Sequence, residues 1–211
     1  MEITWHGQGC LRLAERGYPT VVTDPHDPDE TGLALSGLEA SLVTSSRLVD
    51  DPRSLLWPQV AGVSRTVSAP GEYEIGGVFI TGAACPPSDE DRENVVYTIT
   101  YGRTALCYLG ELAGPLKQSQ IEAIGPVTVL VIPVGIPGGL TPAMAAETVG
   151  LIEPAVVVPV HYDVPGLLVE RLPLEGFLKE MGVSEPTSLE VLRVTDGAAS
   201  EETQIIVLEP R

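Results

Sequence analysis

Two uninterrupted apolar runs in the second half of the chain, residues 129–132 (VLVI) and 156–158 (VVV), constrain the fold most strongly. Each run has the length of a strand but lacks the alternation of a strand with one solvent-exposed face. Both strands are therefore expected to be covered on both faces. A helix is predicted between them over Pro142–Ile152, with Thr141 as its N-cap and Pro142 at its first position. Strand, helix and strand in this order predict an α/β fold with helices outside the sheet.

The first half of the chain is predicted to be mostly antiparallel sheet. Short strands separated by turn residues are expected at 3–5, 10–13, 20–23, 40–44, 63–69, 72–75, 78–81, 94–101 and 105–109. Gly76-Gly77 suits a two-residue hairpin turn. Beyond residue 115 we expect helices at 116–124 and 166–181, and strands at 127–133, 155–160, 189–194 and 203–208. One domain over residues 1–211 is the simplest account.

Charge and cysteine content exclude several classes of function and partner. The chain has 12 Lys and Arg against 29 Asp and Glu, a formal net charge of −17, so we expect neither nucleic acid nor an anionic membrane as a partner. The three cysteines form no C-x-x-C pair, and no apolar run approaches the roughly 18 residues of a membrane span. We expect a cytoplasmic protein with a small-molecule ligand, and self-assembly into a homo-oligomer is compatible with the sequence.

Several local strings, in order, resemble the metallo-β-lactamase fold. The similarity is to small predicted metal-dependent hydrolases related to L-ascorbate-6-phosphate lactonase. The matching strings are 3–13 (ITWHGQGCLRL), 22–25 (VTDP), 70–78 (PGEYEIGGV), 109–112 (LGEL), 125–135 (GPVTVLVIPVG) and 157–162 (VVPVHY). Gln8 stands where relatives often carry histidine. The resemblance implies a four-layer αββα sandwich, with two mixed sheets inside and helices outside.

The main metal-binding loop of that fold has the form T-H-x-H-x-D-H, and here it aligns with residues 44–50 (TSSRLVD). Ser45 and Arg47 replace the first two histidines, and Val49 and Asp50 replace the aspartate and the last histidine. A shift of one residue in either direction does not restore the ligands. The resemblance therefore implies a degenerate metal site.

Two other ligand positions of the family have counterparts. Glu111 resembles the bridging aspartate and His161 the terminal histidine, whereas the mid-chain histidine has no counterpart near residues 85–87. One imidazole and one carboxylate are too few for a zinc site, which takes three or four protein ligands. The permanent charge of Arg47 would also repel a dication.

We therefore expect a homologue without the usual dinuclear metal site and without a metal cofactor, non-hydrolytic or weakly active. Arg47 is predicted to lie where the metal would lie and to form a buried ion pair with Asp24, Asp50 or Glu111. Such a protein would bind a small anionic ligand or act in assembly. The predicted ligand-binding residues are Asp24, His26, Ser45, Arg47, Asp50, Glu111 and His161.

A metal-dependent hydrolase remains the alternative. It would act on a small ester, lactone or phosphorylated sugar, with zinc or manganese held by Asp24, His26, Glu111 and His161. The sequence leaves open which of the two classes applies, and therefore whether the protein is an enzyme.

Overall fold

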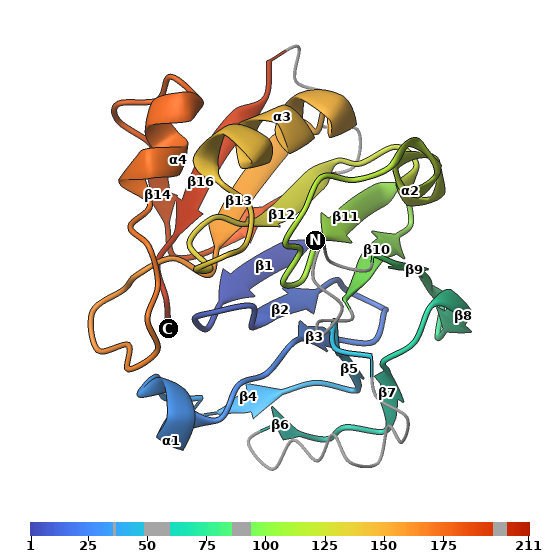
Figure 1. The fold of residues 1–211 in the computed structure, drawn as a ribbon. Coiled ribbons are helices and arrows are strands. Elements are labelled where there is room, and N and C mark those ends of the chain that lie inside the picture. The colour runs from blue at the N-terminus through green and yellow to red at the C-terminus, as the bar shows by residue number, and fades with distance from the viewer. Residues whose placement is uncertain (36, 49–59, 86–93, 196–201) are drawn as a thin grey trace.

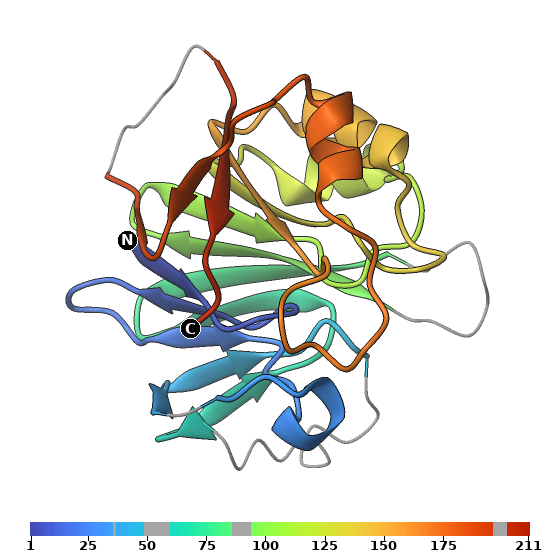
Figure 2. The same ribbon diagram turned by 90° about the vertical axis from the view of Figure 1, so that its left-hand side faces the viewer.

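The chain forms two large mixed β-sheets that pack face to face, in a computed structural model that describes residues 1–35, 37–48, 60–85, 94–195 and 202–211 (Figure 1). Seen from the side in Figure 2, the two sheets lie one above the other, with three helices stacked beyond one of them. One continuous core of buried apolar side chains fills the space between the sheets. The predicted sandwich of two mixed sheets is confirmed.

The first sheet has six strands in the order β15-β1-β2-β3-β5-β7. The strands are β1 (Glu2–Trp5), β2 (Leu11–Ala14), β3 (Val21–Thr23), β5 (Leu42–Thr44), β7 (Arg65–Val67) and β15 (Leu192–Arg193). Strands β1, β2 and β3 pair antiparallel as predicted, and β3, β5 and β7 pair parallel. The ends of β3 and β5 therefore point in the same direction.

Both faces of this sheet are buried. Val21 and Leu42 face the core between the sheets, while the next residues, Val22 and Val43, belong to a second apolar cluster on the outer face. The outer cluster is covered by a small sheet of β4 (Leu38–Glu39) and β6 (Val60–Ala61). The helical layer expected on this side is thus reduced to α1 (Pro28–Thr31), because β4 and β6 cover the apolar side chains instead.

The second sheet has eight strands in the order β14-β16-β13-β12-β11-β10-β9-β8. They are β8 (Gly71–Ile75), β9 (Val78–Ala84), β10 (Val95–Tyr101), β11 (Thr104–Tyr108), β12 (Val129–Pro133), β13 (Val156–Val160), β14 (Thr187–Leu189) and β16 (Gln204–Leu208). Strands β8 to β11 pair antiparallel and β11, β12 and β13 pair parallel. Gly76 and Gly77 form the turn between β8 and β9 with φ of 59° and 82°, as a two-residue hairpin turn requires.

Three helices cover the outer face of the second sheet (Figure 1). They are α2 (Gln118–Ile124), α3 (Pro142–Ile152) and α4 (Glu175–Glu180). Helix α3 begins as predicted: the Thr141 hydroxyl accepts a hydrogen bond from the Met144 N–H at 3.2 Å. In the described part of the chain, no helix is long and apolar enough to span a membrane.

The long helix predicted over residues 166–181 is wrong, because only Glu175–Glu180 is helical. Pro173 lacks an N–H group and disfavours helical backbone at the residue before it. The preceding segment, which we call the 163–174 loop, makes backbone hydrogen bonds elsewhere: Leu168 N–H donates to the Thr31 carbonyl at 2.9 Å and Leu172 N–H to that of Gly135 at 2.7 Å. The first bond holds the loop beside the end of α1, and the second holds it beside the segment that follows β12.

Candidate functional site

The carboxyl ends of β3, β5, β11 and β13 converge on one pocket of about 340 Å³. Asp24 directly follows β3, Ser45 follows β5 and His161 follows β13, while Glu111 comes three residues after β11. Parallel strands end at the same edge of a sheet, which is where open α/β sheets bind their ligands. The pocket is large enough for a small molecule.

Six of the seven residues predicted to bind a ligand line this pocket. They are Asp24, His26, Ser45, Arg47, Glu111 and His161. The seventh, Asp50, lies outside the described residues. The loop between β1 and β2 adds Gln8 and Gly9, and the 163–174 loop adds Val169 and Arg171. The four added residues were not predicted as site residues.

Hydroxyl donors hold the Asp24 carboxylate in place. Its Oδ1 accepts from the Ser46 backbone N–H at 2.6 Å, and its Oδ2 accepts from the Ser46 hydroxyl and, at 2.6 Å, from the Tyr108 hydroxyl. Burial raises the pKa of Asp24 from 3.8 to about 6; the bonds from Ser46 and Tyr108 oppose this rise, and the charge of Glu111 adds to it. Asp24 therefore exchanges a proton close to neutral pH.

Ser46 and Tyr108 are the partners that sequence reasoning missed. Ser46 directly follows Ser45, and Tyr108 ends β11 just before the LGEL string. Gly9 makes room for Tyr108: a Cβ at that position would lie 2.1 Å from the Tyr108 hydroxyl and 2.7 Å from Nε2 of His161. A buried tyrosine at the end of a strand, next to a motif, is a signal that could have indicated Tyr108.

Both ring nitrogens of His26 make hydrogen bonds. Nε2 lies 2.9 Å from the His6 carbonyl oxygen, which can only accept, so Nε2 carries the proton in that bond. Nδ1 lies 2.8 Å from the Thr31 hydroxyl. His26 therefore has no ring nitrogen available unless one of these bonds breaks.

His161 has the opposite environment. Its side chain is 3% exposed, and neither ring nitrogen has a hydrogen-bond partner among the described residues. Burial, and then the charges of Arg171 and Arg47, lower its pKa from 6.5 to about 3. The imidazole is therefore neutral at physiological pH, with one N–H donor and one acceptor. The positive charges of both guanidinium groups therefore disfavour protonation of this ring.

Among the described residues Arg47 pairs with Glu111, one of its three predicted partners, but the ion pair is exposed and not buried as expected. Its side chain is 76% exposed, and its Nη2 lies 4.0 Å from Oε1 of Glu111. Ser46 and Tyr108, rather than a guanidinium, contact the Asp24 carboxylate. The prediction that Arg47 occupies the place of a metal ion is therefore wrong, although Arg47 does line the pocket.

The described residues of the pocket do not fit a pair of metal ions. In the parts of the chain that are described, no group of three or more His, Cys, Asp or Glu side chains could hold a metal. Of the four residues in the reduced ligand set, Asp24 already accepts three hydrogen bonds and His26 uses both ring nitrogens. Coordination by His26 would require one of its bonds to break, whereas Asp24 keeps one lone pair on Oδ1.

Comparisons with known proteins agree with the fold. A family model described as a beta-lactamase superfamily domain matches residues 2–161. A crystal structure from Thermotoga maritima, of a proposed Zn-dependent hydrolase of the metallo-beta-lactamase superfamily, has 28% identity and a TM-score of 0.78, covering 100% of this chain and 99% of that one.

Two more distant structures share the fold. A proposed metal-dependent hydrolase from Parabacteroides distasonis has 14% identity and a TM-score of 0.64, covering 99% of this chain and 93% of that one. Igni18, a metallo hydrolase from the archaeon Ignicoccus hospitalis, has 17% identity and a TM-score of 0.64, covering 92% of this chain and 99% of that one. No curated protein matches the chain.

Proposed function

The chain belongs to the beta-lactamase superfamily, and from this premise we propose that its pocket binds a small anionic ligand without a pair of metal ions. The observation that carries the proposal is the set of hydrogen bonds from Ser46 and Tyr108 to Asp24. The donors built into the chain hold this carboxylate in place and partly oppose the rise of its pKa that burial causes. We infer a non-hydrolytic binding protein.

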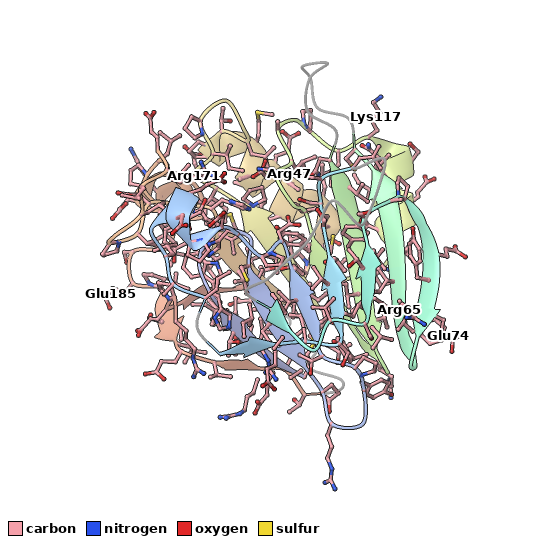
Figure 3. All side chains as sticks on the ribbon, turned by 90° about the horizontal axis from the view of Figure 1, so that it is seen from below. Arg47, Arg65, Glu74, Lys117, Arg171 and Glu185 are labelled. Atoms are coloured by element: carbon pink, nitrogen blue, oxygen red, sulfur yellow. The ribbon has the colours of Figure 1, made fainter. Side chains whose placement is uncertain are left out.

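The pocket's cations support an anion as the ligand. Arg47 and Arg171 both line the pocket, and Figure 3 shows both at the same end of the strands. The positive charges of both act on the buried ring of His161. A carboxylate or phosphate beside them would form charge-assisted hydrogen bonds, which are the stronger kind. Carboxylates line the same pocket, and one of them, Asp27, caps α1 through its Oδ1, which accepts from the Asp29 N–H at 2.9 Å.

Two measurements on the purified protein test this function. After incubation with zinc or manganese and dialysis, elemental analysis should give well under one equivalent of metal. Calorimetry should then detect one succinate per chain, and Arg47→Gln should weaken that binding by about tenfold. Arg65→Gln is the matched control: Arg65 is also exposed, but it pairs with the start of β5 rather than its end. Stoichiometric metal, or succinate binding equal in the two variants, would refute the proposal.

One observation favours the alternative, a metal-dependent hydrolase of a small ester. The two unpartnered ring nitrogens of His161 are in the state that a metal ligand requires. Coordination would need further donors from Asp24, Glu111 or His26. The same elemental analysis separates the two functions, because this one requires bound zinc or manganese and loss of ester hydrolysis when a chelator removes it.

A further inference from the structure

The wall formed by Gln8 and His161 has hydrogen-bonding groups that the protein itself does not use. Gln8 is 4% exposed, and neither its amide oxygen nor its amide nitrogen has a partner among the described residues. His161 is in the same situation at both ring nitrogens. Buried polar groups are nearly always paired, so four unpaired atoms on one pocket wall require an explanation.

The backbone holds these two side chains in place under strain. Gln8 has φ of 49° and His161 has φ of 58°, a region that residues other than glycine rarely adopt. The Trp5 indole N–H donates to the Gln8 carbonyl at 2.8 Å and fixes the turn. Gly9 lies against the imidazole, since a Cβ there would be 2.7 Å from Nε2 of His161. Strained residues held by their surroundings are typical of functional sites.

The chemistry of the wall is mixed, unlike that of the arginines. The Gln8 amide both donates and accepts, and the neutral imidazole of His161 donates from one nitrogen and accepts at the other. A carboxylate or phosphate oxygen only accepts, so an anionic group would satisfy only half of these atoms. The matching group must both donate and accept. It must also be small, because all four atoms are enclosed. A hydroxyl, with a single heavy atom, meets both conditions.

We propose that the ligand is a small hydroxycarboxylate, with its carboxylate at Arg47 and Arg171 and its hydroxyl bonded to Gln8 and His161. This inference rests on the proposed function, because the arginines must first bind the carboxylate. Two other polar residues of the pocket, Asp24 and His26, already make hydrogen bonds within the protein, whereas the side-chain amide of Gln8 and the ring nitrogens of His161 have no partner among the described residues.

The test compares acids that differ only by a hydroxyl. Calorimetry would be run on the full chain with three pairs: malate and succinate, lactate and propionate, and 3-hydroxybutyrate and butyrate. Within each pair the charge is equal, so the arginines contribute equally. Two additional hydrogen bonds should make the hydroxy acid bind about tenfold more tightly. Gln8→Met, a substitution of similar shape, should reduce that preference while retaining binding of the plain acid. Gln118→Met, at an exposed glutamine of α2, should leave it unchanged.

A spectroscopic measurement keeps the inference testable if Gln8→Met does not fold. The chain has three histidines, so nitrogen-labelled histidine gives few imidazole signals. Malate should shift the ring nitrogen signals of His161 more than succinate does.

The outcomes separate the two proposals. If plain and hydroxy acids bind equally well, or if the preference survives Gln8→Met, the hydroxycarboxylate inference is wrong while anion binding stands. If none of the six acids binds, both proposals fail. A preference that depends on Gln8, together with a shift of the His161 signals, supports the inference.

Discussion

Replacing Asp24 by asparagine tests whether its charge is destabilising in the folded protein. The amide has nearly the same shape, and its oxygen can still accept from the Ser46 backbone N–H. In the wild type the hydroxyls of Ser46 and Tyr108 donate to the carboxylate. In the variant the NH₂ group can donate to these hydroxyls, because a hydroxyl can also accept. The substitution therefore removes the titrating charge and keeps the contacts with Ser46 and Tyr108, while the two hydroxyl protons lose their acceptor, a cost that does not depend on pH.

The sign and size follow from the pKa of Asp24, which the fold raises from 3.8 to about 6. A group with a raised pKa contributes stability that is fully present below the unfolded-state pKa and is lost as pH rises through the folded-state value. A shift of about two pKa units changes the free energy of unfolding by about 3 kcal/mol between a pH well below the unfolded-state pKa and a pH well above the folded-state pKa. About 2 kcal/mol of this change falls between about pH 4.5 and pH 8. Asparagine has no such dependence, so Asp24→Asn should gain on the wild type across that range.

Urea unfolding of both proteins at several pH values would measure the effect. The difference in the free energy of unfolding, variant minus wild type, should rise by about 2 kcal/mol from about pH 4.5 to pH 8, with most of the rise below the folded-state pKa. Asp29→Asn, at an exposed aspartate in α1, should show no such rise. A difference that is flat, or that falls with pH, would refute the reasoning, because the Asp24 anion would then be stabilised by a cation in the folded state.

Three further substitutions test individual contacts. Gly9→Ala should destabilise the fold by about 1–3 kcal/mol, because its Cβ would lie 2.1 Å from the Tyr108 hydroxyl. Gly150→Ala in α3, where a Cβ meets nothing within 4 Å, should instead stabilise the fold. Equal shifts of the two melting temperatures would contradict this prediction. Arg47→Gln should change the free energy of unfolding by less than about 1 kcal/mol, because its ion pair is exposed; a loss of several kcal/mol in urea would restore the buried-pair hypothesis. Gln8→Met should raise the stability of the ligand-free protein by about 1 kcal/mol, because it removes two unpaired polar atoms from the interior; lower stability would mean that the amide already has partners.

Much of the fold could be predicted because its signals are local. The antiparallel pair of β1 and β2, the glycines at 76 and 77 and the cap at Thr141 are each contained within a few residues, and all three are confirmed. The family-level resemblance is confirmed as well, whereas the relation to lactonases stays a prediction. The helix over residues 166–181 was wrong because Pro173 outweighs an apolar pattern.

The site was predicted less completely. Strand ends and family motifs place Asp24, Glu111 and His161 in one pocket, as expected. The charge arrangement could not be predicted, because Tyr108 and Asp24 are 84 residues apart and meet only through packing of the two sheets. The exposure of Arg47 could not be predicted either, because it is set by the packing around the pocket.

The hydroxyls around Asp24 also bear on how the protein matures. Ser46 and Tyr108 are supplied at translation, so the pocket reaches its final form when the two sheets close. Under the proposed metal-free function, such a site would need no later loading step and would not compete with other cellular proteins for scarce ions. Its occupancy would follow the concentration of its ligand alone.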